Sequence, residues 1–164
     1  MFFFCRFALP EMKKSVYVAL LFVIVLSSCN DKPFFEKEHD FPGDTWKRFD
    51  FTVFEVPVNK GDILDFSLTV KYYKKFGETL PLNITLYTPE GEMRSRDYNI
   101  NLNRGKIKRE EVQGTSVYTK TFSIHKGIKF YKKGKCKIRI EQKLSKYETE
   151  GIKSITLKAV KSKN

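Results

Sequence analysis

Hydrophobic and polar residues alternate along most of the chain after residue 45, and this period of two is typical of half-buried β-strands. The clearest case runs from Leu64 to Tyr72, where apolar residues alternate with polar or charged ones. In the segment before it, Phe49, Phe51 and Val53 alternate in the same way and are expected to face the core. The same pattern predicts strands over residues 49–53, 64–72, 82–86, 98–102, 117–124, 136–140 and 152–160.

Turn signals separate these segments. Asn59-Lys60-Gly61-Asp62 and Thr88-Pro89-Glu90-Gly91 combine glycine with residues that favour tight turns. The polar stretch 103–114 has few apolar residues and is predicted to be a surface loop. About seven antiparallel strands at this spacing, without an amphipathic helix, predict a single all-β domain over residues 45–164, a β-sandwich or jelly roll.

The first 28 residues follow a different pattern, which predicts a signal peptide. Lys13 and Lys14 precede eleven mostly apolar residues, 16–26, as the charged and apolar regions of a secretory signal do. Eleven residues are too few to cross a bilayer as a helix, which needs about 20. Residues 1–11 do not fit the signal pattern, so we predict that translation starts at Met12.

The signal ends in Leu26-Ser27-Ser28-Cys29, which matches the bacterial lipobox of a leucine, two small residues and a cysteine. The small serines let the peptidase approach the backbone, and the Cys29 thiol receives diacylglycerol before cleavage. An ordinary signal with a chance cysteine, or a short membrane anchor, is the alternative. The prediction is a lipid anchor on Cys29 in the outer membrane, held stably by two or more acyl chains such as palmitate.

Residues 29–44 are predicted to form a tether between this anchor and the domain. Pro33, Pro42 and Gly43 interrupt the segment, and its charges are mixed. A pure linker needs no phenylalanine, yet Phe34 and Phe35 lie near its start. We therefore expect part of the tether to pack on the domain.

The net charge of +12 is concentrated in the last third of the chain, where residues 104–164 hold eighteen basic and five acidic residues. The simplest interpretation is a solvated, lysine-rich sheet face, because lysine on exposed strands discourages edge-to-edge aggregation. An acidic partner or anionic lipid is the alternative. The export signal takes the protein away from nucleic acid, so no nucleic-acid partner is expected.

Candidate chemistry is sparse. Cys136 is the one cysteine outside the signal region and is expected to point inward with Ile138 and Ile140, as a structural thiol. His39 and His125 are far apart and have no ligand neighbours at metal-binding spacing. Phosphate-binding and hydrolase motifs are missing from the sequence. We therefore predict a protein that is not an enzyme, with no catalytic residues, no metal site and no cofactor.

Aromatic residues are abundant, with fifteen Phe, eight Tyr and one Trp. Exposed rings on a β-sandwich can stack on sugars, and the candidates for such a binding face are Trp46, Tyr72, Tyr73 and Tyr87. Tyr72 and Tyr73 are adjacent, so one of them must face outward if the strand continues through both. The alternative is that these rings fill the core.

The order of the motifs is similar to that of the GldH-type gliding-motility lipoproteins. The shared features follow the lipobox and lie along most of the mature chain: Trp46 before Phe49-Asp50-Phe51, Leu68-Thr69-Val70-Lys71-Tyr72-Tyr73, Leu80-Pro81-Leu82, Thr88-Pro89-Glu90-Gly91, Gly134, Ile138-Arg139-Ile140-Glu141-Gln142 and Gly151-Ile152.

This resemblance implies a non-enzymatic component of the envelope machinery for gliding and its associated secretion. Such a component would act through contacts with other envelope proteins, and Cys29 is the only functional residue that the resemblance carries over. The alternative function is that of a surface lipoprotein whose β-sandwich binds glycan.

Overall fold

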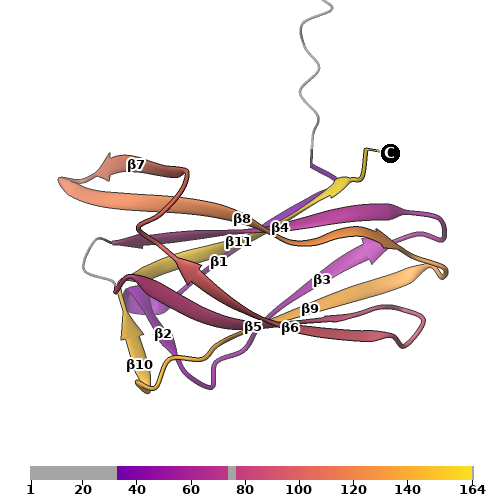
Figure 1. The fold of residues 1–164 in the computed structure, drawn as a ribbon, viewed down its shortest axis with the longest axis horizontal. Helices are drawn as coiled ribbons and strands as arrows, with labels where there is room; N and C mark the ends of the chain where they lie inside the picture. The colour runs from indigo at the N-terminus through magenta and orange to yellow at the C-terminus, as the bar shows by residue number, and fades with distance from the viewer. Residues whose placement is uncertain (1–32, 74–76, 164) are drawn as a thin grey trace, which may run out of the picture. The chain divides into compact units, whose positions relative to one another are not determined.

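Strands make up most of the computed structural model, which describes residues 33–73 and 77–163 (Figure 1). The first sheet has five antiparallel strands in the order β1-β11-β4-β8-β7, namely β1 (Phe35–Asp40), β11 (Ile152–Lys161), β4 (Ile63–Tyr73), β8 (Thr115–Lys129) and β7 (Ile107–Val112). The second has four in the order β3-β9-β5-β6, namely β3 (Thr52–Val58), β9 (Gly134–Gln142), β5 (Thr79–Tyr87) and β6 (Met93–Asn101).

Two short strands and one turn complete the described chain. β2 (Thr45–Lys47) pairs with β10 (Glu148–Glu150), and the single 3-10 turn η1 (Pro42–Asp44) joins β1 to β2. None of the helices in the described part of the chain could span a membrane. The signal peptide, Met12 and Cys29 lie outside the described residues.

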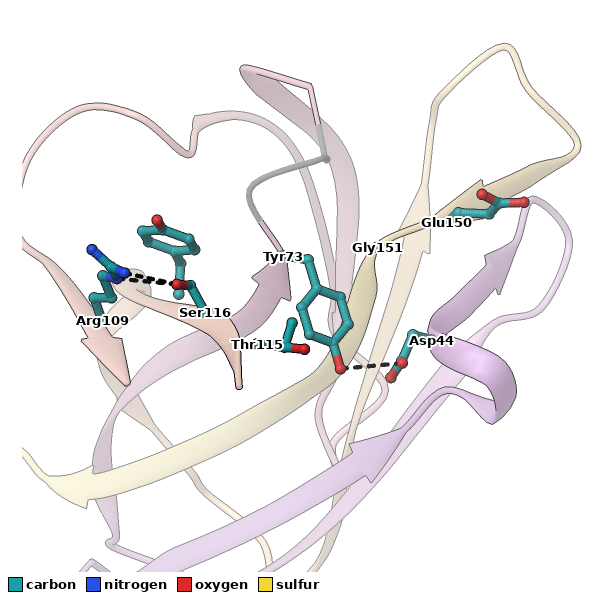
Figure 2. Close-up of a pocket in the computed structure, with 8 residues that line it drawn as sticks. Asp44, Tyr73, Arg109, Thr115, Ser116, Glu150 and Gly151 are labelled. Carbon is teal, nitrogen blue, oxygen red and sulfur yellow. Dashed lines mark hydrogen bonds between the residues drawn. The ribbon is translucent and has the colours of Figure 1, made fainter. Parts of the chain in front are cut away.

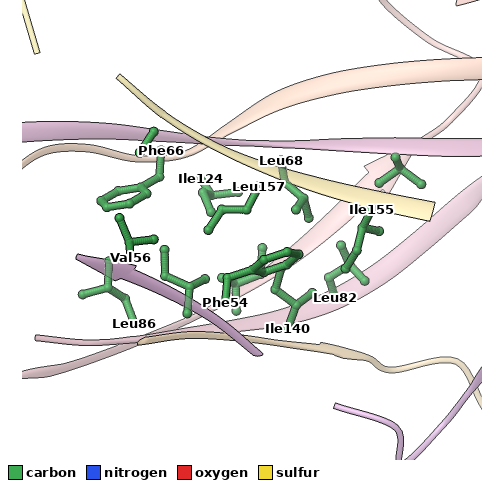
Figure 3. Close-up of a cluster of buried hydrophobic side chains, with 14 of the residues drawn as sticks. Phe54, Val56, Phe66, Leu68, Leu82, Leu86, Ile124, Ile140, Ile155 and Leu157 are labelled. Carbon is green, nitrogen blue, oxygen red and sulfur yellow. The ribbon is translucent and has the colours of Figure 1, made fainter. Parts of the chain in front are cut away.

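The two sheets face each other across one hydrophobic core, and Figure 3 shows their side chains meeting in the middle. On β4 every second side chain is buried, from Leu64 to Tyr72, as the alternation in the sequence predicts. The opposite layer supplies Phe54 from β3, Ile140 from β9 and the alternating apolar residues of β5. The prediction of an all-β antiparallel sandwich is confirmed.

The hairpin from β5 to β6 fits closely against the start of β9. Thr88 and Gly91 close the turn, in which the Gly91 N–H donates to the Thr88 carbonyl over 3.1 Å. Gly134 lies against this turn, and a Cβ at that position would come within 2.8 Å of Pro89 Cβ. The glycine is therefore required by the close approach of the two segments.

The predicted orientation of residues 49–53 is wrong by one residue. β3 begins at Thr52, and its alternate residues from Thr52 through Phe54 to Val58 face the core. Phe49, Phe51 and Val53 are exposed instead. Apolar residues occupy both frames of the alternation here, and a shift of one residue moves every side chain to the other face.

Two segments that were predicted as irregular are edge strands. Residues 107–112, within the stretch predicted as a loop, pair with β8 as β7 through a two-residue turn in which Gln113 and Gly114 both have positive φ. Residues 35–40, within the predicted tether, pair with β11 as β1, so the sheet begins before residue 45. Neither strand shows the alternation of apolar and polar residues, because most side chains on both faces of each strand are exposed.

The aromatic residues of the predicted tether do pack on the domain. Phe41 is buried, and Phe34 and Phe35 are partly buried against the core. His39 on β1 meets Phe41 edge-on, with ring centroids 5.1 Å apart. This expectation from the sequence is confirmed for residues 34–41.

Candidate functional site

An open pocket of about 750 Å³ lies at the end of the sandwich where β4 finishes and β11 begins. Figure 2 shows Tyr73 reaching across it, with its hydroxyl donating to Asp44 Oδ2 over 3.2 Å. Thr115 and Ser116, at the start of β8, form the neighbouring wall. Elements that are distant in the sequence, namely η1, β4, β7, β8 and β10, therefore build this pocket.

Most charged groups of the pocket are already engaged by neighbours. Arg109 Nη2 donates to Ser116 Oγ and to Glu111 Oε1, each over 2.9 Å. Burial raises the pKa of Tyr73, and its hydrogen bond to the Asp44 carboxylate raises it further. The lining contains no histidine or cysteine that could activate the hydroxyls of Thr115 and Ser116. The pocket can accept a polar ligand by hydrogen bonding and by contact with an aromatic ring.

A second candidate site is a surface that we call the aromatic–arginine patch, formed by Arg48, Phe49, Phe51, Arg139 and Tyr147. The rings of Phe49, Phe51 and Tyr147 are 64%, 41% and 62% exposed. The Arg139 guanidinium lies 3.7 Å from the centroid of Phe51, and that of Arg48 lies 5.6 Å from the centroid of Phe49. Phe49 and Tyr147 are neighbours, with ring centroids 6.4 Å apart.

Backbone and side-chain hydrogen bonds hold the patch in place. Trp46 Nε1 donates to the carbonyl of Asp50 over 2.9 Å, which fixes the segment that carries Phe49. The Arg48 N–H donates to the Tyr147 carbonyl over 2.8 Å, which ties the segment that carries Phe49 to the one that carries Tyr147. Trp46 itself is buried and stacks on Phe41 with 4.5 Å between ring centroids. The exposed rings thus stand on a rigid support.

The four aromatic residues that were candidates for a binding face do not share a surface. Trp46 is 0% exposed, so its ring cannot meet a ligand without unfolding part of the core. Tyr72 is only 3% exposed and lies at the edge of a smaller pocket beside Leu102 and Tyr118. Tyr73 lines the pocket of Figure 2, whereas Tyr87, 36% exposed, lies at the opposite end of the sandwich beside Lys137. Of the four, Tyr73 alone lines the pocket of Figure 2, and Tyr72 lines a different, smaller one.

Sequence patterns did not reveal the aromatic–arginine patch. Phe49 and Phe51 were assigned to the core because they alternate with polar residues, and Tyr147 follows no pattern. The signal that could have distinguished them is the stronger alternation that begins at Thr52 and continues through Phe54 to Val58. The longer alternation of residues 52–58, which ends in a turn, therefore indicates which side chains are buried better than the short alternation of residues 49–53 does.

Cys136 is buried on the same face of β9 as Ile138 and Ile140, as the sequence predicts. Burial raises the pKa of its thiol to about 12, and the nearby Glu90 adds to this effect. A thiol in this state is not a nucleophile at neutral pH. No group of three or more His, Cys, Asp or Glu side chains within residues 33–73 and 77–163 could hold a metal ion.

Comparisons with known proteins identify the family. No curated protein and no solved structure gives a significant match to the chain. The model of the GldH lipoprotein family matches residues 33–158, which include β1 to β10 and most of β11. The match confirms the resemblance found in the motifs of the sequence. The chain therefore belongs to the GldH lipoprotein family.

Proposed function

We propose that the protein is a lipid-anchored, non-enzymatic component of the envelope machinery for gliding motility and its associated secretion. In this proposal it works by holding another envelope protein on the aromatic–arginine patch. The observation that carries the proposal is a surface of three exposed aromatic residues, the exposed Arg48 and the half-buried Arg139 on a support that is fixed from the core.

The chemistry of the patch suits a protein partner. Phenylalanine, tyrosine and arginine are enriched in protein interfaces, and the residues that dominate binding free energy tend to be large and central. The hydrogen bond from Trp46 to Asp50 fixes the segment before binding, so less conformational entropy is lost when the partner docks. The guanidinium group of Arg48 favours a partner surface that combines apolar residues with carboxylates. That of Arg139 already pairs with Glu141 over 3.6 Å.

The anchor proposed on Cys29 would keep the start of the domain close to a membrane, whereas the patch lies beyond the far end of β1. Leu26-Ser27-Ser28-Cys29 fits the lipobox, and only four residue steps separate Cys29 from Pro33, where the described domain begins. Four residues span at most about 14 Å when fully extended. In this proposal, palmitate or similar acyl chains on Cys29 hold the protein in the outer membrane. The acyl chains thereby give the domain a fixed position in the envelope.

The test separates lipidation from partner binding. The full chain and its Cys29→Ala variant are expressed in the native host, labelled with a palmitate analogue and purified from cross-linked cells. The expected result is label on the unmodified protein alone, together with gliding or secretion proteins identified by mass spectrometry. Equal label on both proteins would refute the anchor, and labelled protein without any such partner would refute the proposed contacts.

A glycan-binding function is favoured by a different observation, the open pocket at Tyr73. The ring of Tyr73 can stack on a sugar, and the neighbouring carboxylates of Asp44 and Glu150 can accept hydrogen bonds from the sugar hydroxyls. If this alternative holds, Tyr73→Ala abolishes binding to a glycan array, whereas Phe49→Ala leaves it unchanged. Absence of glycan binding by the unmodified protein would refute the alternative and leave the proposed function untouched.

A further inference from the structure

A second cleft, of about 520 Å³, lies between β6 of one sheet and β8 of the other. Its walls bring together the side chains of Arg94, Arg96, His125 and Lys126. None of the residues that line it is an aspartate or glutamate. The cleft is open because β7 pairs with β8 only as far as Lys120, so the rest of that edge of β8 has no neighbouring strand among the described residues.

The register of β6 directs both arginines toward the space between the sheets. Arg94 lies opposite Leu86 on β5, and Arg96 lies opposite Ile84. Both of these partners are 0% exposed, and directly opposed residues of an antiparallel pair share one face. The two guanidinium groups therefore extend from the core face of an edge strand, where an apolar residue would ordinarily stand.

Irregularities in β8 bring His125 to the same place. The pairing of β8 with β4 shifts register on both sides of Phe66, and as a result Ile124 and His125 are both buried although they are consecutive. Gly127, with φ +63, completes the bulge, and its N–H donates to Asp65 Oδ1 over 2.7 Å. Bulges of this kind re-aim side chains and are common beside functional sites.

The imidazole of His125 is unusual for a buried side chain. It is 7% exposed, and its Nε2 atom is buried without a hydrogen-bond partner in the described structure. Burial lowers the pKa of His125, and the positive charges of Arg96 and Arg94 lower it further. Buried polar atoms without partners are rare and call for a specific cause, such as a ligand that supplies the partner.

The cations of the cleft are only partly neutralised within the protein. Arg94 Nε donates to Glu92 Oε1 over 2.7 Å. None of the ion pairs in the described part of the chain includes Arg96 or Lys126. Tyr98, whose hydroxyl donates to the Ile124 carbonyl, closes the cleft at one end. The site thus offers several donors and a net positive charge to one anion.

We propose that this cleft binds a phosphate group through Arg94, Arg96 and Lys126, with His125 beside it. A guanidinium group can donate two parallel hydrogen bonds to the oxygens of a phosphate, and a phosphate has enough acceptor oxygens to satisfy several donors at once. The phosphate can come from free inorganic phosphate or from the headgroup of a phospholipid. No step of this proposal depends on the aromatic–arginine patch.

The position of the cleft makes a lipid headgroup a reachable source. Phe35 pairs with Ala159, Ala159 with Phe66, and Phe66 with His125, so these four residues form one row across the sheet. Three strand spacings correspond to about 14 Å. If Cys29 is anchored, six residue steps before Phe35, the cleft lies near the bilayer surface.

The experiment follows the imidazole of His125 by NMR in the full chain, purified in detergent micelles and labelled with ¹⁵N-histidine. The chain has two histidines, and a His39→Gln variant leaves the His125 signals alone in the spectrum. Inorganic phosphate is titrated at constant ionic strength, with chloride as the reference anion. The expected result is a saturable shift with phosphate only, together with a higher pKa of His125, because a bound anion offsets the arginine charges.

Matched variants separate a specific site from a general charge effect. Arg96→Gln is expected to weaken phosphate binding by about tenfold, which corresponds to the loss of one charge-assisted hydrogen bond. Arg104→Gln removes the same charge outside the cleft and is expected to change binding by less than about twofold at this ionic strength. Arg96→Lys keeps the charge but loses the paired donors, so an intermediate loss is expected. Spectra of the free variants that match the parent show that each still folds.

A second arm distinguishes the two sources of phosphate. The same protein is placed in nanodiscs of phosphatidylglycerol or of phosphatidylcholine, without added phosphate. A His125 shift in phosphatidylglycerol that Arg96→Gln removes supports the headgroup, whereas a shift with inorganic phosphate alone supports the free ion. Identical responses to phosphate and chloride, or equal losses in Arg96→Gln and Arg104→Gln, would overturn the proposal. The micelle arm does not require acylated Cys29, so its result is independent of the proposed anchor.

Discussion

Trp46 and Phe49 are three residues apart, yet one is fully buried and the other is 64% exposed. Trp46 stacks on Phe41 inside the sandwich and holds the carbonyl of Asp50 through its indole N–H. Phe49 lies on the surface with Tyr147 and beneath the guanidinium of Arg48. The difference shows that aromatic content alone does not define a binding face. The buried ring stabilises the segment, and the exposed rings are available to a partner.

Truncation of Trp46 is the strongest test of this division. Trp46→Ala removes a large ring that is 0% exposed and leaves the Asp50 carbonyl without its donor. We expect the free energy of unfolding to fall by about 3–5 kcal/mol. Urea denaturation followed by circular dichroism measures this loss. A loss below about 1 kcal/mol would mean that the ring does not support the fold.

Cys136 provides a smaller test of the buried region, because its thiol is protonated in the fold at pH values that ionise an exposed thiol. The pKa rises from 9.0 to about 12 on folding, so between these values the unfolded chain releases a proton that the folded chain keeps. Stability therefore falls as pH rises above 9, by about 1.4 kcal/mol per pH unit for this group alone. Urea denaturation at pH 8 to 10 should show a steeper decline for the parent than for Cys136→Ala, and parallel curves would contradict the assignment.

The ion pair between Glu38 and Lys71 links β1 to β4 on the outer face of the sheet. We expect it to contribute less to the free energy of unfolding than the buried groups do. The Lys71 hydrogen bond, followed by that of Ser154, lowers the pKa of Glu38. Its stabilisation is therefore present above the ordinary pKa of glutamate and is lost as pH falls through the lowered value. Both side chains are more than a third exposed, so solvent screening limits the cost of Glu38→Gln to about 0.5 kcal/mol.

Truncation of Phe49 should have the smallest effect on stability and the largest effect on binding. Because the ring is 64% exposed, Phe49→Ala should change the free energy of unfolding by less than about 0.5 kcal/mol. The same variant is expected to reduce recovery of the envelope partner from cross-linked cells. Tyr131→Ala, at a ring that is 61% exposed and outside the patch, is the matched control. Equal recovery from Phe49→Ala and Tyr131→Ala would contradict the function assigned to the patch.

The sequence predicted the regular parts of the fold and missed the parts that depend on long-range pairing. The alternation of β4 was visible because one face of that strand is buried along its whole length. β1 and β7 were missed because edge strands with exposed side chains leave no apolar pattern. The remaining error is one of register: the sequence pattern placed Phe49 on the core face, whereas the buried face of β3 begins with Thr52 and Phe49 is exposed.

The candidate sites were harder to predict than the fold for the same physical reason. The cleft depends on bulges that turn His125 inward and on the cross-strand position of Arg96, neither of which has a local sequence signal. Tyr73 was a candidate from the sequence because it adjoins the buried Tyr72, and the structure gives it a place in a pocket. Its partner Asp44 lies 29 residues away and could not be paired with it from the sequence.

Site-specific photo-crosslinking in the native host tests the central claim most directly. A photoreactive amino acid is placed at the position of Phe49 and, in a separate strain, at that of Tyr131, and the adducts are identified by mass spectrometry. The proposed function predicts an adduct with a gliding or secretion protein of the envelope from position 49 and not from position 131. No adduct at position 49, or the same adduct from both positions, would contradict it.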